Sequence, residues 1–170
     1  SEKSLELHRK ALAIFEKTNK GYYCEGLNTM GSFFAETQNY DSAIYYFNKS
    51  CLMAQELNDN FTLAVSNLNL SDVMLLMGKN KEAYNYAEKS LVLSRENGLG
   101  DILKKTYKKL YEINLKLGNS KKTFEYYKLF SALKDSLVND ENKRQMDEIS
   151  LRYDTDKKDS EIDLLSKDKE

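Results

Sequence analysis

The sequence predicts an all-α protein, a right-handed solenoid of helical hairpins followed by a long C-terminal helix. The first observation is a period of forty residues, since 78–83 (GKNKEA) recurs as 118–123 (GNSKKT) and, one period earlier, stands as 38–43 (QNYDSA). A fixed period of this length is typical of arrays in which a helical pair cannot bury its apolar side alone. The second is composition: the chain has no proline and seven glycines, and it is rich in Leu, Lys, Glu, Asn and Ala, which favours helix over sheet.

Read along the chain, the pattern predicts helices over 2–19, 22–37, 40–58, 61–77, 80–97, 100–117 and 120–165. They group into a half repeat (1–19), three repeats (about 22–59, 61–99 and 101–138) and a charged helical linker (139–170). Residues 1–138 would then form the solenoid. Within the first repeat, apolar and small residues recur at intervals of three and four, which places them on one stripe of each helix. They are Leu27, Met30, Gly31, Phe34, Ala43 and Phe47.

Two units carry distinctive features. The helix over 61–77 is apolar nearly all round, which predicts that it lies sandwiched between neighbours. In the third repeat, Tyr111 and Thr123 stand where the first has Gly31 and Ala43. We therefore expect the packing of the third hairpin to open or shift.

The residues listed for the first repeat follow the order and spacing of the tetratricopeptide repeat, a family that this chain resembles. The resemblance implies that a protein or peptide partner binds along the concave face, which the first helix of each repeat would line. Our candidate contacts on that face are Asn28, Asn69, Asp72, Lys105, Lys109 and Glu112.

Some members of the family clamp the terminal carboxylate of a peptide. Asn69, Lys105 and Lys109 match three of the five roles in such a clamp, whereas Asn28 and Ser32 depart from the other two. Lysines supply charge-assisted donors for a carboxylate. The alternative is that these lysines are an ordinary solvated helix face. The apolar positions Val65, Leu68 and Leu75 are interpreted as inter-helix core rather than as a ligand groove.

A second resemblance covers the C-terminal part. The segments 126–127 (YY), 133–137 (LKDSL), 139–141 (NDE), 153–158 (YDTDKK) and 161–165 (EIDLL) follow in order. This looks like the junction in tetratricopeptide-containing sensor histidine kinases and transcriptional regulators of Bacteroidetes-type bacteria. It implies a non-enzymatic, periplasmic sensory domain that relays through its C-terminal helix, with membrane attachment only through a downstream segment.

The sequence leaves several alternatives open. The protein could instead be a free-standing scaffold or adaptor, or a cytoplasmic regulator that senses a peptide. The C-terminal segment is either a solvated linker or a helix that pairs in a homodimer of the full-length protein; its apolar stripe (Met146, Ile149 and Tyr153) is too short for a strict coiled coil.

No catalytic, cofactor or metal site is expected in this fragment. His8 is the single histidine, so a histidine-based triad or metal cluster has no basis, and its alignment predicts a packed or partly buried imidazole. Cys24 and Cys51 lack CxxC spacing and are interpreted as small buried residues, with a disulfide between them as the alternative. A net charge of −1 without a basic face does not suggest nucleic-acid binding.

Overall fold

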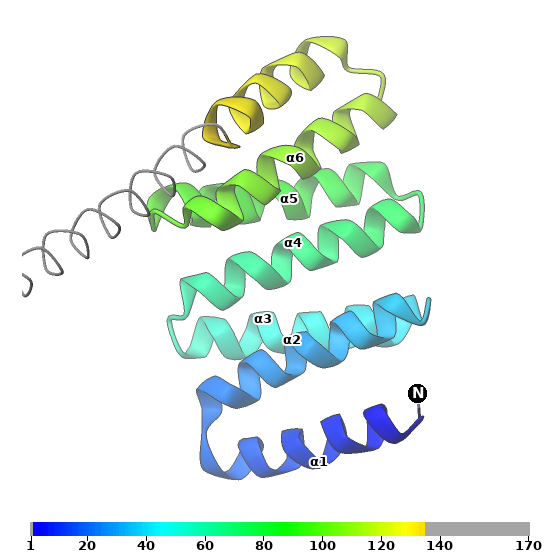
Figure 1. Cartoon of the computed structure of the whole chain (residues 1–170), viewed down its shortest axis with the longest axis vertical. Coiled ribbons are helices and arrows are strands. Elements are labelled where there is room, and N and C mark those ends of the chain that lie inside the picture. Colours follow the sequence, from blue (N-terminus) through cyan, green and yellow to red (C-terminus); the bar gives the residue numbers. More distant parts are fainter. Residues whose placement is uncertain (1, 135–170) are drawn as a thin grey trace, which may run out of the picture. The chain divides into compact units, whose positions relative to one another are not determined.

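The computed structural model describes residues 2–134, which consist of helices joined by short turns and contain no strand (Figure 1). In order the labelled helices are α1 (Glu2–Thr18), α2 (Lys20–Glu36), α3 (Tyr40–Glu56), α4 (Asn60–Leu76), α5 (Asn80–Glu96) and α6 (Gly100–Lys116). Residues 120–134 are also helical. The first six predicted helices are confirmed, with ends that differ by no more than two residues. The seventh prediction (120–165) is confirmed as far as residue 134, and its remainder lies outside the described residues.

The turns after α2 to α6 share one construction. At each, a residue in the left-handed region follows the helix, and the next amide N–H bonds back across the last turn, as Asn39 N–H does to the Phe34 carbonyl at 2.8 Å. At three of these turns the residue that donates this N–H also caps the next helix with its side chain, as Asn39 does by accepting from the Ser42 N–H at 3.2 Å. The left-handed residues recur every twenty positions: Gln38, Asn58, Gly78, Gly98 and Gly118.

The leading helix is joined differently. Asn19 alone separates α1 from α2, and its side chain accepts from the Tyr22 N–H at 3.0 Å. Because this connection is two residues shorter than the others, α1 is out of register with the twenty-residue period. His8, on α1, is partly buried as expected, with its ring 6.2 Å from that of Phe33.

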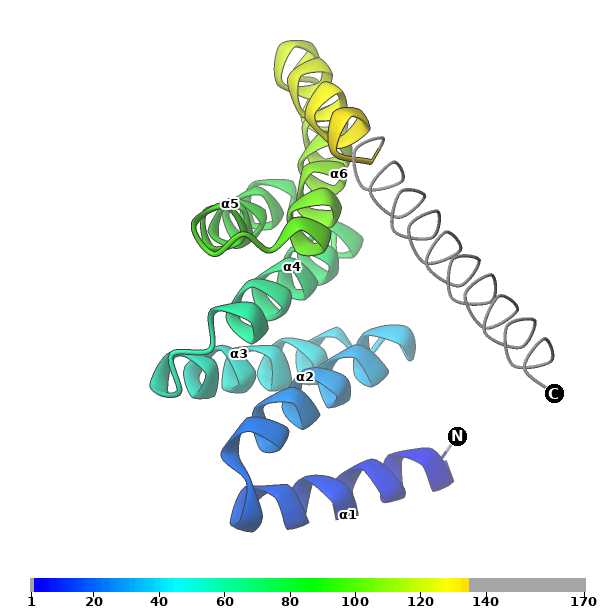
Figure 2. The same ribbon diagram turned by 60° about the vertical axis from the view of Figure 1, so that its left-hand side comes forward.

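The most buried helix is α4. It contacts α2, α3, α5 and α6, and Figures 1 and 2 show it in the middle of the array. Leu70 and Val73 of α4 form a core cluster with Ala43 and Phe47 of α3. The prediction that the segment 61–77 is sandwiched is therefore confirmed, and the physical reason is burial on several faces at once.

Small side chains set the closest approaches between helices. Ser50 Oγ accepts from Ser66 Oγ at 3.0 Å where α3 meets α4, and the Ser90 and Thr106 hydroxyls lie 3.0 Å apart where α5 meets α6. Cys24 is fully buried, as predicted. Cys51 is half-buried, and both thiols are free, so the disulfide alternative is not present here.

The packing of the third hairpin differs from that of the first, as expected. Gly31 touches Phe47 closely in the first repeat, whereas Tyr111 at the equivalent position packs its ring 5.5 Å from that of Tyr127. A cavity of about 340 Å³ lies beside this pair, lined also by Thr123 and Phe124. Residues Ser1–Phe130 form one compact unit, whereas the predicted boundary at 138 and the linker 139–170 lie outside the described part of the chain.

Candidate ligand-binding face

The first helices of the three repeats, α2, α4 and α6, lie side by side, with α3 and α5 behind them (Figures 1 and 2). Three cavities of about 280, 260 and 500 Å³ follow one another along this face. The first two share Ser32 and Asn69, and the second and third share Asp72 and Leu76. The cavities therefore form a continuous strip, which we call the α2/α4/α6 strip.

Two of the six candidate residues link α2 to α4. Asn69 Nδ2 donates to Asn28 Oδ1 at 2.8 Å, and Asn28 is almost fully buried. This bond fixes the orientation of both amides, which leaves fewer of their polar atoms free for a ligand.

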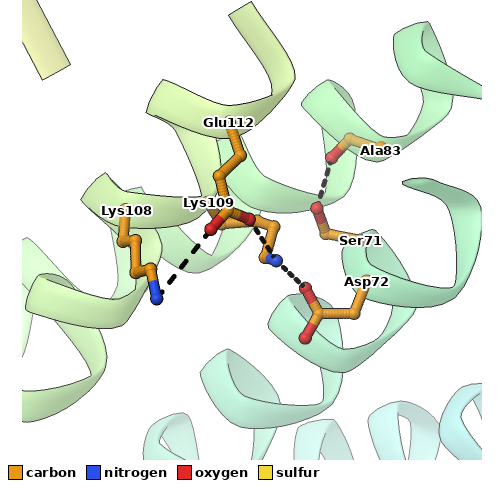
Figure 3. Close-up of polar contacts among 6 residues, drawn as sticks. All are labelled: Ser71, Asp72, Ala83, Lys108, Lys109 and Glu112. Atoms are coloured by element: carbon orange, nitrogen blue, oxygen red, sulfur yellow. Dashed lines mark hydrogen bonds and ion pairs between the residues drawn. The ribbon is translucent and has the colours of Figure 1, made fainter. Parts of the chain in front are cut away.

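Three more candidates form an ion-pair cluster between α4 and α6 (Figure 3). Lys109 Nζ lies 2.9 Å from Asp72 Oδ1 and 2.7 Å from Glu112 Oε2, and Lys108 Nζ lies 4.0 Å from Glu112 Oε1. The Lys109 side chain is 20% exposed, whereas those of Asp72 and Glu112 are 44% and 32% exposed. The two acids are thus more exposed than the lysine as whole side chains, although Asp72 Oδ1, which faces Lys109, is buried.

The electrostatics follow from this arrangement. Burial alone would lower the pKa of Lys109, but the carboxylates of Asp72 and Glu112 outweigh it and raise that pKa. Burial raises the pKa of Asp72, and the attraction of Lys109 only partly offsets this effect. Lys109 is therefore a charged side chain already engaged by two acids, rather than a free cation awaiting a ligand carboxylate.

The sixth candidate, Lys105, is exposed and has no ion-pair partner within residues 2–134. The structure thus brings Asn28 to Asn69, and Lys109 to Asp72 and Glu112, and leaves Lys105 apart. Whether these residues contact a ligand stays a prediction.

The floor of the largest cavity of the strip is apolar. Leu75, Leu76, Tyr111 and Leu115 line it beside the charged cluster. Leu75 is buried, in keeping with the interpretation of that position as core, but Leu76 and Leu115 are 64% and 59% exposed. The six candidate contacts did not include this exposed pair. Its signal was available in principle, because both leucines fall on first-helix positions that face the strip.

The described residues contain neither a metal-binding cluster nor a membrane-spanning helix. Within residues 2–134 no cluster of three or more His, Cys, Asp or Glu side chains is arranged to hold a metal ion. None of the described helices is both long enough and apolar enough to cross a membrane.

Comparison with known proteins bears on the architecture. Residues 33–95 match the family described as the SusR N-terminal TPR domain. The fold is similar to the TPR domain of Arabidopsis FLU (TM-score 0.65, 20% identity, covering 69% of this chain and 98% of that one). It is also similar to aspartyl phosphate phosphatase F from Bacillus subtilis (TM-score 0.76, 19% identity, 79% of this chain), of which it spans only 36%.

No curated protein matches the sequence. At these identities the structural likenesses speak for the fold alone. TPR domains act in protein–protein interaction and are generally non-catalytic scaffolds. The hairpins, the period and the structural likenesses together show that the described part of this chain has the tetratricopeptide-repeat fold, and residues 33–95 are similar to the SusR N-terminal TPR domain.

Proposed function

We propose that this chain is the sensory or protein-interaction domain of a bacterial signal-transduction receptor, and that its α2/α4/α6 strip holds an extended peptide segment of the partner. The observation that carries the proposal is the continuity of the strip, whose successive cavities share lining residues. An extended segment can place alternate side chains in neighbouring cavities of such a strip.

The surface of the strip suggests how affinity arises. The exposed Leu76 and Leu115 offer apolar contact, and burying an exposed leucine stabilises a complex by about 1.5–3 kcal/mol. Lys105 adds an exposed positive charge on α6, whose contribution is small and sensitive to salt. We therefore assign most of the affinity to the leucines and some of the orientation to the polar groups.

A selection from a phage-displayed library of linear peptides, made against the whole chain, tests this assignment. Affinities of the selected peptides are then measured by calorimetry. We expect Leu76→Ala/Leu115→Ala to weaken binding about tenfold or more. The matched control is Leu7→Ala/Leu52→Ala, a pair on α1 and α3 with exposures of 59% and 62%, and it should bind as the unmodified chain does.

A second measurement separates charge from apolar contact. Lys105→Ala/Lys109→Ala, compared with the exposed pair Lys81→Ala/Lys121→Ala, is titrated at two salt concentrations. A loss confined to low salt assigns the lysines a steering role. If neither the leucine nor the lysine pair of the strip changes the affinity, the peptide binds elsewhere on the solenoid.

The receptor assignment and the periplasmic location rest on the resemblance of the C-terminal segment, together with the match to a family described as N-terminal. We test them with alkaline phosphatase fused after residue 170 in the full-length gene, since this enzyme is active only outside the cytoplasm. Activity supports an extracytoplasmic domain. An inactive fusion beside a fluorescent cytoplasmic reporter at the same site would favour the scaffold or the cytoplasmic regulator.

A homodimer through the C-terminal helix predicts a doubled mass by light scattering.

A further inference from the structure

A second cavity lies away from the α2/α4/α6 strip, between α3 and α5 with α4 as its floor, and its volume is about 440 Å³. We propose that this outer cavity binds a small organic acid with an apolar body and a single carboxylate. The proposal is independent of the peptide partner, because none of the lining residues of the outer cavity lines the strip.

The repeat itself explains why this cavity is open. In the preceding repeat, Tyr23 occupies the position of Leu63, and its hydroxyl accepts from Lys49 Nζ at 2.7 Å while donating to Glu16 Oε1 at 3.0 Å. The Tyr23 ring, with its hydroxyl held between Lys49 and Glu16, therefore fills the groove between α1 and α3. Leu63 has neither the ring nor the hydroxyl.

In the following repeat a different tyrosine occupies the corresponding groove, which lies beside α5 and α6. Tyr107 occupies the position of Asn67, and its hydroxyl accepts from Arg95 Nε and Nη2 at 3.1 and 3.0 Å. Tyr126, at the position of Tyr86, donates to Glu88 Oε1 at 2.8 Å. The middle repeat carries the smaller residue at both tyrosine positions, Leu63 and Asn67, which leaves the space unfilled.

The polar groups that line the outer cavity have unused capacity. Asn67 is 5% exposed, and its Nδ2 donates to the Leu63 carbonyl at 2.8 Å, but its Oδ1 has no hydrogen-bond partner within the described residues. Lys89 Nζ lies 5.0 Å from the centroid of the Tyr86 ring and forms no ion pair in that part of the chain. Asn67 Oδ1 can therefore accept a hydrogen bond from a ligand without losing another, and Lys89 can add an ion pair to its contact with the Tyr86 ring.

The charge of the lining selects an anion. Lys89 is the one charged side chain among the lining residues, because burial raises the pKa of the Cys51 thiol to about 11 and keeps it neutral at pH 7. Leu63, Leu70 and Leu93 supply apolar surface. A carboxylate beside Lys89 gains a charge-assisted contact, and a hydroxyl or N–H on the ligand can donate to Asn67 Oδ1. The volume lies within the range of about 300–1,000 Å³ of small-molecule pockets.

Two probes of the same size separate the charge from the shape: 4-phenylbutyrate and its uncharged analogue 4-phenylbutanamide. Each is titrated into the ¹⁵N-labelled whole chain and followed by amide chemical shifts. We expect 4-phenylbutyrate to shift the backbone amide signals of α3, α4 and α5 around Asn67 and Lys89. We also expect it to bind about tenfold more tightly than 4-phenylbutanamide.

Variants test the named residues. Lys89→Met should lower the affinity for the acid to that for the amide, whereas Lys81→Met, at an exposed lysine of the same helix, should leave both unchanged. Asn67→Tyr and Leu63→Tyr place in the cavity the residue that neighbouring repeats carry, and each variant that keeps the native thermal unfolding midpoint should lose both probes. Lys89→Met decides the question alone if neither filled variant folds.

The proposal is overturned by any of four results. These are equal affinities for acid and amide, unchanged binding by Lys89→Met, retained binding by a folded tyrosine variant, and no saturable shifts around the outer cavity at about 10 mM acid.

Discussion

At one repeated position the side chain between the two helices of a hairpin grows larger along the chain, and its contacts change with it. At positions 31, 71 and 111 the chain carries Gly, Ser and Tyr. Gly31 lies against the Phe47 ring, Ser71 Oγ donates to the Ala83 carbonyl at 2.8 Å, and Tyr111 borders a cavity. In a closely packed interior a larger side chain displaces its neighbours. From Gly31 to Tyr111 the packing at this position therefore changes from a close contact to a ring beside a cavity.

Gly31→Ala tests this directly. A Cβ at position 31 would lie 2.5 Å from Phe47 Cδ1, and Phe47 is itself buried, so it cannot swing away freely. We expect the free energy of unfolding in urea to fall by about 1–3 kcal/mol. The control is Gly100→Ala, whose Cβ would meet nothing within 4 Å and should raise that free energy by about 0.5 kcal/mol. Equal effects of the two changes would contradict the close contact.

The ion-pair cluster predicts a dependence on pH. Lys109→Met leaves Asp72 and Glu112 without their shared cation, which raises the pKa of the Asp72 carboxyl further in the folded state. The folded state then binds protons more tightly than the unfolded state, so the loss of stability is largest at neutral pH and shrinks as pH falls towards 4.

For this partly exposed pair we expect the loss at pH 7 to be about 1–2 kcal/mol in urea unfolding. Lys105→Met, which removes an exposed lysine without an ionic partner, should change the stability by less than about 0.5 kcal/mol at either pH. A loss for Lys109→Met that is the same at pH 7 and pH 4 would show that the charges of the cluster are not its cause.

At the scale of the element, a turn of three residues can both end one helix and cap the next. The N–H of Asn39 closes α2 while its side chain opens α3, and Asp59 does the same between α3 and α4. Lys79 and Leu99 hold the same place without a side-chain cap. The backbone bond is thus common to all five turns, and the side-chain cap is not.

Gln38→Gly is predicted to stabilise the protein. Gln38 has a φ of 61°, which costs a residue with a Cβ about 1–2 kcal/mol, so glycine should raise the thermal unfolding midpoint despite its larger entropy when unfolded. Asn58→Gly should gain less, because asparagine tolerates this region. Conversely, Gly78→Ala, whose Cβ has open space around it, should lose about 1 kcal/mol through backbone strain alone. A lower midpoint for Gln38→Gly would refute the strain argument.

Burial is distributed unevenly over the whole solenoid. α4 holds ten buried residues, whereas α1 has none over residues 5–18. In a repeat array each unit is stabilised chiefly by its neighbours, so an end helix gains from one side only.

Native-state hydrogen exchange should therefore be slowest in α4 and fastest in α1. The measurement is amide exchange of the whole chain followed by mass spectrometry of its peptides. Uniform protection from α1 to α6 would instead mean that the described helices unfold as one cooperative unit.

Much of this architecture could be predicted from the sequence. The period placed the turns, and the spacing of Leu27, Gly31, Ala43 and Phe47 identified the inner faces of a hairpin. These predictions succeeded because turn chemistry and helical periodicity are local, repeated properties. The register of α1 was less accessible, since the Asn19 connection is two residues shorter than the others.

The candidate site was only partly accessible. Sequence alone determined that this chain is a helical repeat protein, that α4 is central and that Asn69, Asp72 and Lys109 lie on first helices. Only the tertiary structure decided that Lys109 is held by two carboxylates and that side chains leave the outer cavity between α3 and α5 unfilled. The reason is that ion pairs and cavities depend on which side chains meet across separate helices. The order of residues along one helix does not specify the distances between side chains of different helices.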